Sequence, residues 1–97
     1  MSSRLASTVI ILGISLSACA AQLTPAGTTA KLMKADPNPN CEDLGHVEAE
    51  SGTEENVKIL LRNQSGEKGA NWVRLETVEA LPYGRSKYAG TAFRCPQ

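Results

Sequence analysis

Alternation of apolar and polar positions predicts three strands in the second half of the chain. Residues 42–50 alternate with a period of two, which places successive side chains on opposite faces of an extended segment. A second run begins after Asn71, with Val73 and Leu75 on one side and Trp72 on the other. A turn signal at residues 82–85 separates it from a third run at residues 87–95.

A helix is predicted between the first two strands. Thr53 is a good N-cap residue, and two carboxylates follow it in the first turn, where they favour the positive end of the helix dipole. The apolar stripe that follows consists of Val57, Leu60 and Leu61. The helix ends either early at Gly66 or at Gly69, which suits the left-handed position past a last turn.

The predicted fold is a small α+β domain of order β-α-β-β, with a three-stranded mixed sheet and one helix on one face. A right-handed crossover makes the first two strands parallel, and the hairpin return makes the third antiparallel to both. The end of the third strand then lies level with the start of the first. Cys95 and Cys41 occupy those two points.

The first residues of the chain predict a signal peptide over 1–18. Arg4 is followed by an apolar run at residues 5–16 and then by small residues. The run is shorter than the roughly 20 apolar residues of a transmembrane helix, so the pattern indicates export.

The end of this segment, Leu16-Ser17-Ala18-Cys19, resembles the lipobox of bacterial lipoproteins. The resemblance implies lipidation of Cys19, which becomes the new N-terminus and anchors the protein through several acyl chains. Because Ala20, not Asp, follows Cys19, the resemblance also implies the outer membrane, facing the periplasm. The alternative is an ordinary A-x-A cleavage site at residues 18–20 that releases a soluble protein.

Residues 19–40 are predicted to be the lipidated N-terminus and a flexible linker, ahead of the domain at 41–97. They lack a sustained hydrophobic period and carry Pro25, Gly27, Pro37 and Pro39. A flexible linker of this length gives an r.m.s. reach of about 25 Å. Residues 30–34 are open to two readings, a short strand or a helical turn.

Composition and charge narrow the functional classes. The 97 residues include ten Lys and Arg against ten Asp and Glu, so the formal charge is zero and a nucleic-acid partner is not expected. Aromatic residues make up only 4% of the chain, which predicts a thin core that needs an additional constraint. No metal and no cofactor is expected.

Cys41 and Cys95 remain as an even pair once Cys19 is set aside, and in an exported protein such a pair predicts a disulfide. The chain-entropy estimate for a loop of this length is roughly 4 kcal/mol. The alternative is a metal site that adds His46 and a carboxylate such as Asp43, without C-x-x-C spacing to support it.

Two features are candidates for partner binding. Trp72 lies on the face of the sheet that the helix does not cover, where an aromatic side chain favours contact with a partner, unless the linker or the edge of the domain covers it. The second feature is a basic-aromatic loop that could contact glycan, lipid headgroup or protein, or could simply be a solvated hairpin. Its residues are Tyr83, Arg85, Lys87 and Tyr88.

Several short motifs together resemble a family of small bacterial envelope lipoproteins that contain a domain of unknown function. They are Cys41…Leu44-Gly45…Val47, Leu61-Arg62-Asn63, Gly69-Ala70-Asn71 with Val73, and Gly90-Thr91-Ala92-Phe93-Arg94-Cys95. More distantly, they resemble the stress-sensing outer-membrane lipoprotein of the Rcs phosphorelay. This chain departs from the family at Gln64-Ser65-Gly66 and lacks the second disulfide of the stress sensor.

The expected function is therefore a non-catalytic, lipid-anchored envelope module that binds an envelope protein or peptidoglycan, or senses stress. The alternative is a structural envelope lipoprotein without a dedicated partner. An enzyme is not expected, because catalysis by a thiol would require Cys41 or Cys95 to be free.

Overall fold

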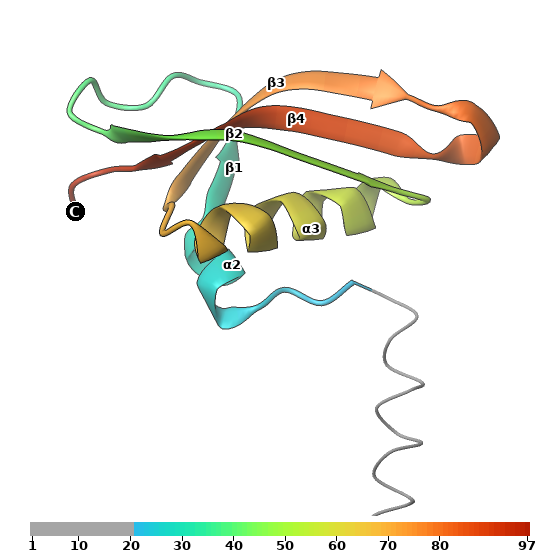
Figure 1. Cartoon of the computed structure of the whole chain (residues 1–97), viewed down its shortest axis with the longest axis horizontal. Helices are drawn as coiled ribbons and strands as arrows, with labels where there is room; N and C mark the ends of the chain where they lie inside the picture. The colour runs from blue at the N-terminus through green and yellow to red at the C-terminus, as the bar shows by residue number, and fades with distance from the viewer. Residues whose placement is uncertain (1–20) are drawn as a thin grey trace, which may run out of the picture.

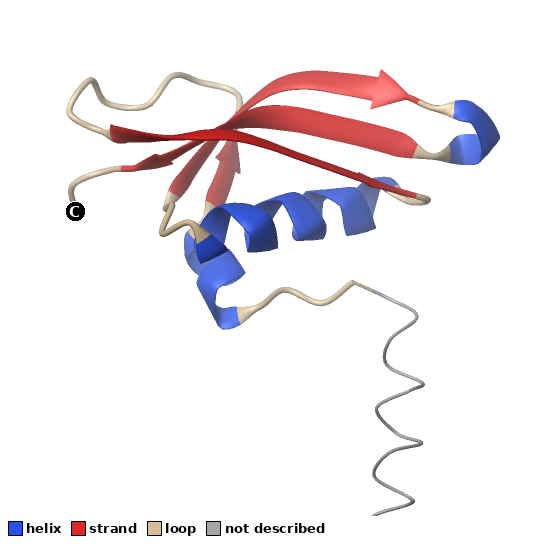
Figure 2. Cartoon of the chain, viewed as in Figure 1, coloured by secondary structure: helices blue, strands red, loops and turns tan. Residues whose placement is uncertain are grey.

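The computed structural model describes residues 21–97 and confirms the α+β class. The elements are α2 (Pro25–Thr29), β1 (Lys31–Met33), β2 (Glu42–Ser51), α3 (Glu54–Glu67), β3 (Trp72–Ala80), a 3-10 turn (Pro82–Gly84) and β4 (Ser86–Arg94). The described strands form one sheet of order β1-β3-β4-β2. Both helices lie on one side of this sheet, and the loop between β1 and β2 passes over the other side (Figure 1, Figure 2).

β4 is the central strand of the predicted β-α-β-β unit. It pairs antiparallel with both β2 and β3, so these two strands run in the same direction on either side of it. The predicted strand directions are confirmed. The core lies between this sheet and α3, and its large buried side chains are Val47, Val57, Leu61, Val73 and Tyr88.

The helix α3 begins where the sequence predicts. The Thr53 hydroxyl accepts a hydrogen bond from the Asn56 N–H at 3.1 Å, which caps the first turn. The helix runs through Gly66, and Gly69, with φ +90°, follows its end. The buried line of α3 runs at a spacing of four through Val57, Leu61 and Ser65, so the predicted core residue Leu60 lies beside it and is 38% exposed.

The prediction of a flexible linker over 19–40 is wrong for its central part. The Thr24 hydroxyl accepts from the Gly27 N–H at 3.0 Å and caps α2, while Pro25 occupies the first turn. Ala30 is fully buried in the core. The small side chains of this segment let it pack closely, and that packing supplies order which its composition does not suggest.

The sheet consequently has a fourth strand that the three-stranded prediction lacks. β1 pairs in parallel with β3, in the register Lys31 to Trp72 and Met33 to Arg74. Of the two readings left open for residues 30–34, the short strand is confirmed.

The predicted disulfide between Cys41 and Cys95 is present, with the two Cα atoms 4.1 Å apart and a sequence separation of 54. Asn71 supports it by bonding the backbone of Cys95 twice. Its side-chain NH₂ donates to the Cys95 carbonyl at 2.8 Å, and its side-chain oxygen accepts from the Cys95 N–H at 2.7 Å. The Gly-Ala-Asn motif therefore has a structural role next to the disulfide.

The predicted signal peptide and Cys19 lie outside the described residues. Within residues 21–97, no helix is both long enough and apolar enough to cross a membrane.

Candidate functional site

The uncovered face of the sheet carries an aromatic pair at one end. Trp72 and Phe93 are opposite one another on β3 and β4, and the Arg74 guanidinium lies 5.2 Å from the centre of the Phe93 ring. The Trp72 indole N–H donates to the Ala35 carbonyl at 3.3 Å. Trp72 is thus half-buried under the segment that follows β1, and the linker covers it in part.

Ion pairs occupy the rest of this face. Arg74 bonds Asp36 at 3.1 Å and Glu76 at 2.6 Å, and the Thr91 hydroxyl donates to Glu76 at 2.8 Å. The bond from Arg74, and then that from Thr91, lowers the pKa of the Glu76 carboxyl below its ordinary value. These contacts neutralise Arg74 and tie the β1–β2 loop to the sheet.

The same pattern continues toward the β3–β4 hairpin. Glu48 lies 3.4 Å from His46 and 3.3 Å from Lys87, and these two bonds, His46 first, lower the pKa of the Glu48 carboxyl. Arg85 lies 3.4 Å from Glu50. His46 is exposed and has the Glu48 carboxylate as its neighbour, an arrangement that fits a surface polar contact. In the described part of the chain, no group of three or more His, Cys, Asp or Glu side chains could hold a metal ion.

The residues of the predicted basic-aromatic loop do not all lie on the surface of the protein. Tyr83, at the tip of the β3–β4 hairpin, is 99% exposed, whereas Tyr88 is 2% exposed and lies in the core. Tyr88 therefore cannot contact a partner, which corrects the prediction. Residues 87 and 88 are neighbours on a strand, so their side chains point to opposite faces of the sheet.

The Tyr88 hydroxyl donates a hydrogen bond to the Glu54 carboxylate at 2.5 Å, at the first turn of α3. Loss of hydration, and then this bond, raises the pKa of Tyr88 to about 12. The same bond lowers the pKa of Glu54. Tyr88 thus joins β4 to the start of the helix, a structural role.

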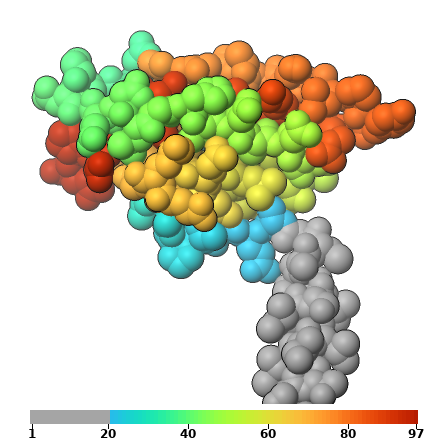
Figure 3. Space-filling model, viewed as in Figure 1, coloured from blue at the N-terminus to red at the C-terminus, as the bar shows by residue number. Residues whose placement is uncertain are grey.

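The hairpin that carries Tyr83 extends past the first turn of α3, beyond the start of the helix (Figure 1, Figure 3). Residues 76–80 of β3 are exposed there. The hairpin is closed by a bond from the Leu81 N–H to the Arg85 carbonyl at 2.8 Å, and Tyr83 takes the left-handed conformation at φ +63°. A side chain in this position is held clear of the domain.

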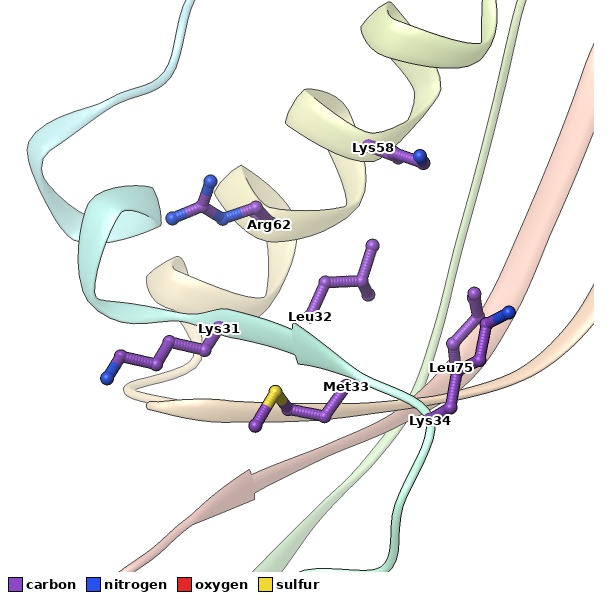
Figure 4. Close-up of a pocket in the computed structure, with 7 residues that line it drawn as sticks. All are labelled: Lys31, Leu32, Met33, Lys34, Lys58, Arg62 and Leu75. Atoms are coloured by element: carbon purple, nitrogen blue, oxygen red, sulfur yellow. The ribbon is translucent and has the colours of Figure 1, made fainter.

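A groove that the sequence did not reveal lies between β1 and α3. It has a volume of about 470 Å³. Figure 4 shows Leu32 on β1 projecting toward α3, and Lys58 and Arg62 on the facing turns of the helix. The residues that line it are Lys31, Leu32, Met33, Lys34, Lys58, Arg62 and Leu75. The sequence places Lys31 and Lys34 on either side of two apolar residues. This pattern does not indicate a groove unless residues 31–33 are known to form a strand that packs beside α3.

The predicted site residues thus fall in separate places. Trp72 is on the uncovered face, Tyr83 is at the hairpin tip, Arg85 and Lys87 pair with glutamates, and Tyr88 is in the core. Comparison with protein-family models, with curated proteins and with solved structures finds no match to this chain.

Proposed function

We propose that this chain is a lipid-anchored protein of the bacterial envelope whose domain is a non-catalytic binding module, with stress sensing as one form of that role. The order of an apolar run, Leu16-Ser17-Ala18 and then Cys19 supports acylation of Cys19. The disulfide between Cys41 and Cys95 fits an oxidising compartment such as the periplasm. The proposed location is the outer membrane, with the domain facing the periplasm.

Tyr83 is the observation that carries the binding role. The chain has one Trp, two Tyr and one Phe; Tyr88 and Phe93 are buried, and Trp72 is half-buried. Tyr83 alone among them is fully exposed, at the tip of a closed hairpin. Tyrosine provides a large contact area at a small cost in side-chain entropy, and it is enriched at the energetic centres of interfaces.

Arg85 and Lys87 lie behind Tyr83 on the same hairpin and would form the polar edge of such a contact. Both side chains are already paired with glutamates on β2. These ion pairs fix the side chains in place and leave them little net charge with which to attract a partner. The proposed partner is another envelope protein or peptidoglycan.

The site of attachment leaves this hairpin accessible. Only Ala20 and Ala21 separate Cys19 from Gln22, whose carbonyl accepts a hydrogen bond from the Asn63 side chain at 2.7 Å. The chain enters the domain on the α3 side of the sheet (Figure 1). An anchor at Cys19 would therefore hold the helical side of the domain near the lipid. The opposite face of the sheet and the hairpin would then remain accessible to a partner.

Photocrosslinking in cells tests this proposal. A benzoylphenylalanine at position 83 is expected to give a specific adduct, while the same probe at the exposed Glu67 position of α3 is not. Cys19→Ala is expected to abolish the adduct by mislocalising the protein. The proposal fails if position 83 gives no adduct, or only those that position 67 also gives.

A second candidate function is a structural lipoprotein without a dedicated partner. It is supported by the ion pairs of the uncovered face, which leave few of its charged groups free for another molecule. In this case Tyr83→Ala leaves every envelope phenotype unchanged, while Cys19→Ala still mislocalises the protein. Intact-mass analysis of the mature chain reports the acyl groups on which both candidates depend.

A further inference from the structure

Positive charge is distributed unevenly between the two sides of the sheet. On the uncovered face, Arg74, Arg85 and Lys87 each lie within ion-pair distance of a glutamate. Within residues 21–97, no carboxylate lies at that distance from Lys31, Lys34 or Arg62. Within the described residues, Lys34 and Arg62 thus bring positive charge without a carboxylate partner to the groove between β1 and α3, with Lys31 at its edge. Lys68, which also has no carboxylate within ion-pair distance, lies apart from the groove, just past the end of α3.

The groove combines this charge with an apolar floor. Leu32 and Leu75 form the floor, and Lys34, Lys58 and Arg62 stand around it (Figure 4). The nearest acidic partner of Lys58 is Glu54, at 3.8 Å on the same helix. At about 470 Å³, the groove lies within the range of small-molecule binding sites.

Arg62 is held in place without being neutralised. Its Nε donates to the Ala30 carbonyl at 2.9 Å, and its Nη2 donates to the Thr28 carbonyl at 3.2 Å. A guanidinium has five N–H donors, so three remain for another acceptor. A fixed guanidinium with free donors matches the oxygens of a phosphate group.

The groove also lies beside the point where the chain leaves for Cys19. Asn63, the residue after Arg62, bonds both the Thr24 N–H at 2.8 Å and the Gln22 carbonyl. With Cys19 acylated, as the proposed function has it, the distance from Gln22 to the anchor is at most about 11 Å of extended chain. The groove then lies within reach of the lipid headgroups.

We infer that this groove binds the phosphate of an anionic phospholipid in the membrane that holds the anchor. Arg62, Lys34 and Lys58 bind the headgroup, and the upper part of an acyl chain lies over Leu32 and Leu75. An added peptide strand is a poorer occupant, because β1 has only three residues and the Ala30 carbonyl beside it is already bonded to Arg62. The inference rests on the proposed anchoring at Cys19.

Hydrogen exchange of the mature protein in lipid nanodiscs tests the inference. Nanodiscs of phosphatidylcholine with a rising fraction of phosphatidylglycerol are expected to slow exchange of the amides at residues 31–34 and 58–62. Lys58→Gln is expected to raise the fraction of phosphatidylglycerol needed for half of this protection about fivefold, as is Lys34→Gln. Lys68→Gln removes the same charge just past the end of α3, outside the groove, and is expected to change the fraction less than twofold.

Three results would overturn the inference: protection that does not depend on phosphatidylglycerol, equal effects of Lys58→Gln and Lys68→Gln, or equal protection by inorganic phosphate in pure phosphatidylcholine. Intact mass of the same sample separates the two proposals. If Cys19 carries no acyl group, the anchoring proposal fails, and soluble short-chain phosphatidylglycerol then tests the groove on that same chain.

Discussion

Tyr88 shows how one hydroxyl links stability to pH. Its pKa is raised from 10.0 to about 12 in the folded protein, so the unfolded chain releases this proton first as the pH rises. The stabilisation is complete below pH 10 and is lost as the pH passes through about 12. We expect the urea midpoint of unfolding to fall across this interval.

Tyr88→Phe is the matched variant for this effect. It keeps the buried ring and removes the hydroxyl that bonds Glu54. We expect the variant to be less stable at neutral pH and to show a smaller alkaline fall of the midpoint. An equal fall in both proteins would mean that another group causes it.

Trp72 provides an optical measure of the β1–β2 loop, since it is the only tryptophan of the chain. Asp36 ties this loop to Arg74. We expect Asp36→Ala to loosen the cover over the indole and to increase quenching of its fluorescence by acrylamide. Because the ion pair is exposed, the urea midpoint should change little. Glu79→Ala removes the same charge from the exposed end of β3, and quenching in that variant should match the unaltered protein.

Among the elements, those with a strong period were predictable and those built from small residues were not. The start of α3 and the three long strands follow from Thr53 and from two-residue alternation. α2 and β1 owe their order to Gly27 and Ala30, which are buried because they are small. Small residues carry no hydrophobic period, so packing on α3 could not be inferred from the sequence.

Gly66 marks the contact between the two helices. A Cβ added there would collide with the backbone of Ala26 in α2. Gly66→Ala should improve helix propensity by about 1 kcal/mol and still destabilise the fold, since overpacking costs about 1–3 kcal/mol. Urea unfolding measures the net loss, and faster exchange at residues 25–33 locates it.

Gly52→Ala is the control for this prediction, because nothing lies within 4 Å of an added Cβ at that position. It should leave the free energy of unfolding within about 0.5 kcal/mol. A Gly66→Ala protein as stable as this control would show that α2 moves away without cost.

For the molecule as a whole, the disulfide was predictable from the parity of the cysteines and from strand direction, two independent lines that agree on Cys41 and Cys95. Its separation of 54 residues makes it a large constraint on the unfolded chain. Replacing both cysteines with serine should lower the free energy of unfolding by about 4 kcal/mol. Urea unfolding of the oxidised protein, the reduced protein and the double variant checks this, and three equal midpoints would contradict it.

The candidate sites were predictable only where a site is local in sequence. The exposure of Tyr83 follows from the turn signal at residues 82–85. The burial of Tyr88 could be inferred only from the register of β4, which determines the face of the sheet on which this side chain lies. The groove joins residues 31–34 to residues 58–62 and exists only because β1 and α3 pack together. Because the formal net charge of the whole chain is zero, the composition gives no sign of the positive charge around the groove.

The hydrogen bonds that join Asn63 to Gln22 and Thr24 also determine where a mechanical force on the N-terminus would act on the domain. Tension on the N-terminus reaches this contact first, followed by α2 and the short β1, while the remainder from Cys41 onward stays closed by its cystine. Once released, residues 22–40 would form a tether segment of at most about 65 Å when fully extended. The envelope could then stretch or be pushed apart while the cystine-closed body remained folded.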